Sequence, residues 1–227
     1  MEDRAQPAEP AASRRGAEHL DQALRQQLGH WRTALGSGAV RVGWKIGLNA
    51  PEVQEKLGIE RSVVGNLTSA TLLRPRASHS LAGAENPKVE PEIAIEVGGD
   101  GSIAGLAAAI EVVDFNRPVD DAYEIVATNI FHRAVAIASS EHEASPEGLT
   151  AVLCVDGEER ESAPADKFDL PAIVALVDET LATADESLEV GDRIIAGSLT
   201  TPVDVRPGQR VSLDLGPLGS VEIDFTD

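Results

Sequence analysis

The stretch that decides the fold is KVEPEIAIEV, residues 88–97, in which apolar and polar side chains alternate. An alternation with a period of two is typical of a β-strand, where successive side chains point to opposite faces. The GGDG sequence at 98–101 predicts a turn, and the apolar run at 104–114, which ends in AIEVVD, predicts a second strand. We therefore expect a β-rich core around these two segments.

Further elements are predicted on both sides of this pair. Apolar residues at helical spacing from Leu20 predict a helix that begins at Ala17, after a polar tail of residues 1–16 that we expect to be disordered. The whole is an α+β fold, in which an N-terminal helical segment and strand (17–75) forms one unit with a β-rich core (76–227). The other predicted elements are strands at 40–48 and within 62–73, helices at 51–57, 123–138 and 171–184, a hairpin from 149, and short strands over the last forty residues.

The composition is that of an acidic protein with a single core. The 227 residues carry a formal net charge of −19, and 42% of them are hydrophobic. Such a surface repels nucleic acids and anionic membranes, and no apolar run reaches the roughly 18–20 residues of a membrane span. The single Cys154 excludes a disulfide within the chain, and residues 1–16 lack the pattern of a signal peptide. We expect a cytoplasmic protein with no nucleic-acid or membrane partner.

Two carboxylates lie on one face of the first strand. Glu90 and Glu92 are two residues apart, so their side chains point to the same side, and like charges there repel unless a cation or water separates them. Pro91 has no N–H for a ladder, which predicts an edge strand or a bulge. Mg²⁺ or Mn²⁺ prefers carboxylate oxygens, so the pair is a candidate metal site. The alternative is an exposed strand face with two solvated glutamates.

Two further charged residues interrupt apolar runs. Glu111 lies within the second strand, where a carboxylate is costly to bury unless it is paired or binds a metal, and Asp114 is the alternative third ligand. Lys45 lies between Trp44 and Ile46, where it is a candidate to hold a substrate carboxylate or to move a proton. For both Glu111 and Lys45, the alternative is a position on the solvent side of a strand.

The remaining candidates are polar residues near glycine or within the predicted helices. Ser198 and Thr200 follow Gly197, which permits a close approach of the backbone, and they are candidate substrate contacts. His132 and Arg133 fall on the predicted helix 123–138, where a lone histidine is more often a packing residue than a catalytic one.

Several motifs occur together in a fixed order. They are GWKIGL at 43–48, PKVEPEIA at 87–94, AIEVVD at 109–114, GDRIIAGSLT at 191–200 and GPLGSV at 216–221. In this order the chain resembles the 2-keto-4-pentenoate hydratase branch of the fumarylacetoacetate hydrolase superfamily, from about the first helix to the C-terminus.

The resemblance implies a mixed β-sandwich or roll, as in fumarylacetoacetate hydrolase C-terminal-like domains, and a homo-oligomer. It implies that Glu90, Glu92 and Glu111 bind Mg²⁺ or Mn²⁺ and that Lys45 is the active-site lysine. The implied activity is that of a hydratase acting on 2-hydroxypenta-2,4-dienoate or 2-oxo-4-pentenoate, a small 2-oxo acid, through an enolate that the metal stabilises.

Two segments depart from the family pattern and keep other functions open. The family often has Asp-Ser-Arg where this chain has DFNR at 114–117, and Asn-Ala-Ser-Ser where this chain has TNIFHR at 128–133. Both changes fall on the expected pocket wall. The alternatives are a 4-oxalocrotonate-type decarboxylase, a hydrolase of the C–C bond of acylpyruvates, and a non-catalytic partner subunit of such an enzyme.

Overall fold

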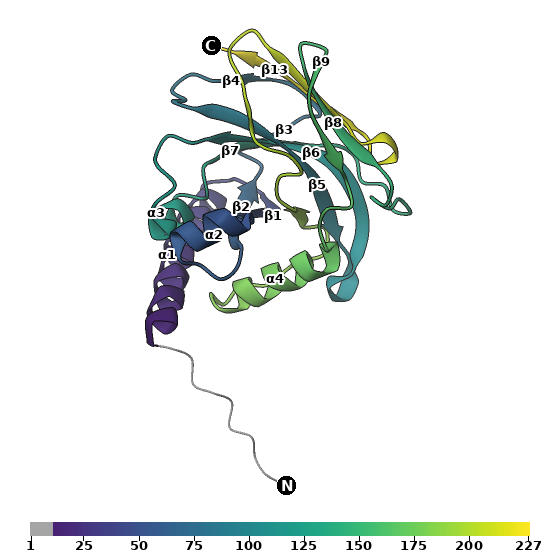
Figure 1. Ribbon diagram of the computed structural model, residues 1–227. Coiled ribbons are helices and arrows are strands. Elements are labelled where there is room, and N and C mark those ends of the chain that lie inside the picture. Colours follow the sequence, from purple (N-terminus) through teal and green to yellow (C-terminus); the bar gives the residue numbers. More distant parts are fainter. Residues whose placement is uncertain (1–10) are drawn as a thin grey trace.

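The fold is built from two curled β-sheets with helices gathered along one side of the larger sheet (Figure 1). A computed structural model describes residues 11–227, and their side chains from residue 18 on. The larger sheet has the order β2-β1-β10-β5-β6-β7-β3, and β11 also pairs with β5. Its strands are β1 (Arg41–Gly47), β2 (Val63–Thr68), β3 (Leu72–Leu73), β5 (Pro87–Val97), β6 (Ile103–Asp114), β7 (His132–Ile137), β10 (Arg193–Ile195) and β11 (Val203–Asp204).

The smaller sheet has the order β4-β13-β12-β8-β9 and packs through β12 and β13 against β6. The predicted hairpin after residue 149 is confirmed as β8 and β9. The strands of this sheet are β4 (Arg76–Ser80), β8 (Thr150–Val155), β9 (Glu158–Pro164), β12 (Arg210–Asp214) and β13 (Ser220–Thr226). With the helices, the two sheets confirm the predicted α+β fold with a β-rich core.

The helices cover the β1–β2 end of the larger sheet. They are α1 (Ala11–Gly36), α2 (Pro51–Leu57), α3 (Ala122–Ala127) and α4 (Leu170–Ala182), with short 3₁₀ turns η1 (Gly99–Gly101) and η2 (Gly216–Leu218). Helix α1 begins six residues before the predicted start at Ala17, and residues 1–10 of the predicted disordered tail lie outside the described part of the chain. Within residues 11–227, the structure contains no helix long and apolar enough to cross a membrane.

The long pair β5–β6 confirms the strand prediction and places the carboxylates. Glu90 lies directly opposite Glu111 in the antiparallel register, so all three glutamates come from neighbouring strands. The prediction that Pro91 marks an edge or a bulge is wrong, since β5 is central and stays in register with β6 at this point. Pro91 lies opposite the break between β10 and β11, where Leu199 donates to its carbonyl. The N–H and C=O of one residue point to the same side of a strand. The N–H that Pro91 lacks would therefore have pointed at this break, where no described strand needs it.

The predicted helix over 123–138 is wrong in its second half. Helix α3 ends at Ala127, and the chain then makes a left-handed turn through Asn129, Ile130 and Phe131, with φ values of 65°, 54° and 60°. It continues as strand β7, which carries His132. Left-handed backbone costs about 1–2 kcal/mol for each non-glycine residue, so this turn needs contacts elsewhere in the fold.

Strand β1 is held in the sheet by contacts with Asp192 and Arg193, at the start of β10. The carboxylate of Asp192 accepts hydrogen bonds from Trp44 Nε1 and from the Arg41 guanidinium. Gly43 pairs with Arg193 so closely that a Cβ there would lie 2.0 Å from the Arg193 carbonyl oxygen. These contacts hold the parallel pair β1–β10 in register.

Candidate metal centre

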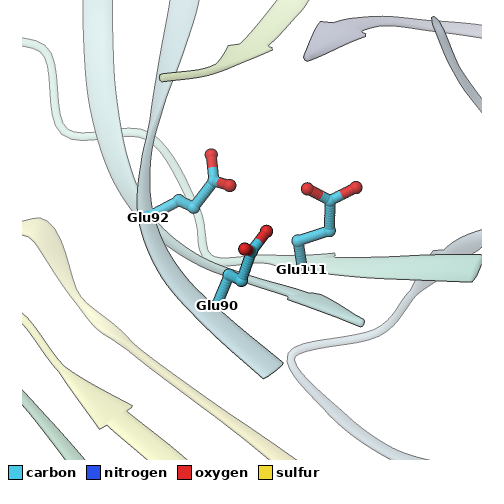
Figure 2. Close-up of side chains that lie close together, drawn as sticks. All are labelled: Glu90, Glu92 and Glu111. Carbon is cyan, nitrogen blue, oxygen red and sulfur yellow. The ribbon is translucent and has the colours of Figure 1, made fainter. Parts of the chain in front are cut away.

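Three glutamates from β5 and β6 gather at one point inside the larger sheet. Figure 2 shows the carboxylates of Glu90, Glu92 and Glu111 pointing to the same side, into one shared space. One carboxylate oxygen from each lies within 4.8 Å of the other two. Glu92 and Glu111 are fully buried, and Glu90 is half-buried. The arrangement confirms that the residues predicted from the sequence come together.

Glu92 and Glu111, the two fully buried members of the cluster, each have one carboxylate oxygen with a hydrogen-bond partner in the described part of the chain and one without. The backbone N–H of Gly197 donates to Glu92 Oε2 at 2.8 Å. Glu111 Oε1 lies 2.5 Å from Lys45 Nζ and 2.7 Å from Nδ1 of His132. The other oxygens, Glu92 Oε1 and Glu111 Oε2, are buried without a hydrogen-bond partner among the described residues. A buried carboxylate oxygen without a donor is costly, so these two atoms point to a missing cationic ligand.

The electrostatics of the three carboxylates differ because their neighbours differ. Burial raises the pKa of Glu90 to about 7, and the charge of Glu111 adds to the rise. Burial and the charges of Glu111 and Glu90 also raise the pKa of Glu92. Burial works in the same direction on Glu111, but Lys45 and His132 outweigh it and lower its pKa. The negative charges of the three carboxylates repel one another, and a further positive charge among them would offset that repulsion.

These observations fit a divalent cation. The donors are carboxylate oxygens, the ligands that Mg²⁺ and Mn²⁺ prefer, and they converge on one point. A bound ion would satisfy Glu92 Oε1 and Glu111 Oε2 and would offset the mutual repulsion. The residues that would hold it are Glu90, Glu92 and Glu111, while Lys45 is already bonded to Glu111.

Asp114, the alternative third ligand, has a different role. Its carboxylate accepts hydrogen bonds from the backbone N–H groups of Glu85 and Asn86, at 3.1 and 2.8 Å, and from Arg133 at 3.3 Å. These bonds tie the end of β6 to the chain before β5. The structure therefore assigns Asp114 to the scaffold and not to the carboxylate cluster.

Lys45 lies beside the cluster with its side chain buried. Its ammonium contacts Glu111 and also donates to the carbonyl of Ile130 at 3.1 Å, so one of its three N–H groups remains for a ligand. Its stem packs over Gly65, where an added Cβ would lie 2.7 Å from Lys45 Cγ. The alternative of a solvent-facing lysine is thereby excluded.

A cavity of about 720 Å³ opens from the cluster to the surface. Lys45 and Glu90 line its inner end, and Ser198 and Thr200 also line it, as the sequence predicted for a ligand pocket. Ser198 donates its hydroxyl proton to the Thr200 carbonyl at 2.8 Å. Most of the other wall is apolar: Ile46, Leu48, Val113, Phe115, Val119, Ile130, Phe131, Ala163, Phe168, Leu199 and Pro202.

The sequence reasoning missed His132 as a member of the site. The helical spacing predicts a packing residue on a helix, but His132 lies on β7, where its Nδ1 contacts Glu111 and its Nε2 lies 2.9 Å from the Thr71 hydroxyl. The signal was available, because His132, Ala134 and Ala136 alternate with Arg133 and larger apolar residues in the manner of a strand.

Comparison with known proteins bears on the identity of this site. No family model matches the chain. The chain is 28% identical over 211 residues to a 4-oxalocrotonate decarboxylase of a Pseudomonas species, which covers 83% of this chain and 80% of that protein. It is 28% identical over 233 residues to the TodF product hydratase of Pseudomonas putida, covering 92% and 85%. A 2-keto-4-pentenoate hydratase of Burkholderia vietnamiensis is 29% identical over 205 residues, covering 82% and 78%.

Solved structures share the fold. The 4-oxalocrotonate decarboxylase from Pseudomonas putida G7, complexed with magnesium and adipate, has a TM-score of 0.77 at 21% identity and covers 97% of this chain and 100% of that one. The fumarylpyruvate hydrolase from Pseudomonas aeruginosa, in complex with Mn²⁺ and pyruvate, has a TM-score of 0.62 at 16% identity, covering 82% and 90%. The resemblance of this chain to the 2-keto-4-pentenoate hydratase branch of the fumarylacetoacetate hydrolase superfamily is therefore confirmed in sequence, and the solved structures share its fold.

Proposed function

We propose that the protein is a divalent-metal-dependent hydratase of short 2-oxo acids of the 2-hydroxypenta-2,4-dienoate type, a hydro-lyase. The observation that carries the proposal is the buried carboxylate cluster, with two unpartnered oxygens, beside Lys45 at the inner end of an apolar cavity. We assign Glu90, Glu92 and Glu111 as ligands of Mg²⁺ or Mn²⁺. The metal-complexed decarboxylase and hydrolase structures support that choice of ion.

Hydration of this substrate requires a site that binds its 1-carboxylate and 2-oxygen and allows water to add at C4. A bound divalent ion would supply the positive charge that stabilises a developing negative charge on the 2-oxygen. Lys45 directs its free N–H at the substrate carboxylate or moves a proton, and Ser198 and Thr200 hold the substrate from the opposite loop. The apolar wall keeps bulk water away from the reacting atoms.

The charges along the cavity favour a hydratase over the runner-up, a 4-oxalocrotonate-type decarboxylase. The substrate of such a decarboxylase carries a second carboxylate at its distal end, whereas the hydratase substrate ends in an uncharged group. Beyond Lys45, the cation among the described lining residues is Lys167, whose ammonium donates to the carbonyls of Ser198 and Leu199 and keeps one further N–H. Glu52 and Glu161 also line the cavity and would repel a second carboxylate.

We further propose a cytoplasmic homo-oligomer in the breakdown of aromatic compounds, with a 2-oxo acid as its small-molecule partner. The names of the relatives fit the catabolic role, while the homo-oligomer rests on the family resemblance. The net charge of −19 argues against nucleic acid or anionic membranes as partners.

The test is turnover by the Mg²⁺-loaded protein. We expect loss of dienoate absorbance with 2-hydroxypenta-2,4-dienoate, no CO₂ release from 4-oxalocrotonate, and no activity with either compound after chelation of the metal. Faster CO₂ release than hydration would make the protein a decarboxylase. Silence with both substrates in the presence of bound metal would favour the non-catalytic partner subunit.

A further inference from the structure

The left-handed turn at Asn129, Ile130 and Phe131 joins α3 to β7 and forms part of the cavity wall. Left-handed backbone is especially unfavourable for a β-branched residue such as Ile130. Conformations of this kind persist where surrounding contacts determine them, and they concentrate at functional sites. The contacts that hold this turn therefore indicate its role in the site.

The amide of Asn129 holds the turn against the edge strand β2. Its Oδ1 accepts from the backbone N–H of Asn66 at 2.8 Å, and its Nδ2 donates to the Asn66 carbonyl at 3.0 Å. The side chain thus satisfies both backbone groups of one strand residue, as a neighbouring strand would. Asparagine combines this paired donor and acceptor with tolerance of left-handed backbone.

The same strand connects the turn to the site. Gly65 is adjacent to Asn66, and a Cβ at Gly65 would lie 2.8 Å from Asn129 Oδ1 and 2.7 Å from Lys45 Cγ. The Asn129 amide and the Lys45 stem are therefore packed over one glycine. From the other side, the Ile130 side chain is pressed against Gly47, where a Cβ would lie 2.5 Å from Ile130 Cγ2.

The turn presents one backbone group to the site, the carbonyl of Ile130. This oxygen accepts from Lys45 Nζ at 3.1 Å, while Glu111 takes a second N–H at 2.5 Å. Two fixed acceptors determine the direction of the third N–H of the ammonium. The three glutamates are held by the β5–β6 pair, so a small shift of the turn would move the Ile130 carbonyl and turn that N–H away from the cavity while the glutamates keep their positions.

We infer that Asn129 is a positioning residue for the proposed reaction, acting through the Ile130 carbonyl to aim the Lys45 ammonium at the substrate. The inference rests on the proposed function, because it gives Lys45 a part in turnover. It separates two groups of residues, since Asn129 and Ile130 orient the lysine while the three glutamates hold the metal. Loss of Asn129 should therefore change kcat and leave metal binding unchanged.

The test is the kinetics of Asn129→Ala and Asn129→Gly in the Mg²⁺-loaded full chain. We expect kcat to fall roughly 10- to 100-fold in both, as a misplaced catalytic group does, with KM and the Mn²⁺ dissociation constant within about twofold of the parent. The glycine variant retains the preference for left-handed backbone and removes only the amide bridge. Asn86→Ala, the same change at an exposed asparagine outside the cavity lining, is the control. Parent-like kcat in either folded Asn129 variant would overturn the inference.

A double variant decides whether the effect passes through the lysine. If Asn129 acts through Lys45, then Lys45→Ala with Asn129→Gly should be no slower than Lys45→Ala alone. Multiplying losses would instead assign Asn129 a separate, structural role. If the parent protein turns over no substrate, the proposed function fails by itself. The inference is then decided by the crystal structure of Asn129→Gly, where an unchanged distance from Lys45 Nζ to the Ile130 oxygen would contradict it.

Discussion

Glu92 is the residue whose removal tests the metal centre most directly. Its carboxylate is fully buried, with one oxygen bonded to Gly197 and the other without a partner among the described residues. Glu92→Gln preserves shape and removes the charge, so we expect Mn²⁺ to bind at least about tenfold more weakly and turnover to be lost. Metal content and a Mn²⁺ titration are the measurements. Glu96→Gln, the same change on the same strand, should behave like the parent, and unchanged metal content in Glu92→Gln would refute the ligand assignment.

Glu90 gives the metal-free protein a characteristic dependence on pH. Its pKa is raised from the ordinary 4.5 to about 7 in the folded state, so the folded protein binds more protons than the unfolded chain between these values. The free energy of unfolding must then fall as pH rises through this window, and the raised pKa of Glu92 acts in the same direction. The lowered pKa of Glu111 acts oppositely, but its window lies below 4.5, and the lowered pKa of His79 acts oppositely only below 6.5, where both carboxylates counter it.

We therefore expect the Tm of the metal-free protein to decrease between pH 5 and pH 8, and Mg²⁺ to restore it mainly at pH 8, where the carboxylates are ionised. Thermal unfolding with and without chelator measures both effects. Glu90→Gln should flatten the decrease. A Tm that rises from pH 5 to pH 8 in the metal-free parent would show that the carboxylates are not destabilising one another.

At this scale the sequence revealed the charged members of the site, together with Ser198 and Thr200, but missed His132 and Asn129. Glu90, Glu92, Glu111 and Lys45 stand out because a charge inside an apolar strand needs a partner. Asn129 carries no such signal, since its role depends on Asn66, which lies 63 residues away in the chain.

At the scale of elements, the segment after α3 shows why a local pattern was misleading. Ile125, Val126 and Ile130 have helical spacing, and all three are buried, but only the first two lie in a helix. The hydrogen bonds from Asn129 to β2 stop the helix and turn the chain into β7. A contact between elements far apart in sequence thus overrides the local helical periodicity. Such a contact cannot be recognised from the residues around position 129 alone.

Strand β2 contributes a glycine whose substitution tests this packing. In Gly65→Ala the new Cβ would meet Lys45 Cγ at 2.7 Å and Asn129 Oδ1 at 2.8 Å. We expect a loss of about 1–3 kcal/mol in the free energy of unfolding, typical of overpacking, together with a lower kcat. Gly29→Ala on the exposed face of α1, where nothing lies within 4 Å, should instead stabilise by about 0.5–1 kcal/mol. Denaturant unfolding compares the two, and equal stability for both variants would contradict the close packing at β2.

At the scale of the molecule, most strands were predictable, while their assembly into two sheets was not. The alternation in β5, the turn after it and the apolar run of β6 are local, so these two strands were predictable from the sequence. The parallel pairs β1–β10 and β4–β13 join segments about 150 residues apart, and nothing in either segment indicates its partner. The cavity depends on that assembly, because its walls come from six separate regions of the chain.

The cavity as a whole predicts which substrates bind. Its wall is mainly apolar, it includes Phe115, Phe131 and Phe168, and the ammonium of Lys167 is engaged by two backbone carbonyls. Saturated 2-oxo acids of increasing length are suitable probes because they bind without turnover. We expect each added methylene to tighten binding to the Mg²⁺-loaded protein by roughly three- to fourfold, the value of about 0.8 kcal/mol per buried methylene.

A second carboxylate at the far end of the 2-oxo acid should weaken binding instead. 2-Oxoadipate has the chain length of 2-oxohexanoate with a carboxylate in place of the last methyl group, and Glu52 and Glu161 in the wall would repel it. We expect it to bind at least about tenfold more weakly in calorimetric titrations, because the charge loses its hydration and the two wall glutamates outnumber Lys167. Phe168→Ala should reduce the gain per methylene and leave the shortest acid unaffected. Tighter binding of 2-oxoadipate than of 2-oxohexanoate would mean that Lys167 releases its carbonyls to bind the second carboxylate, and the cavity would then be that of a decarboxylase.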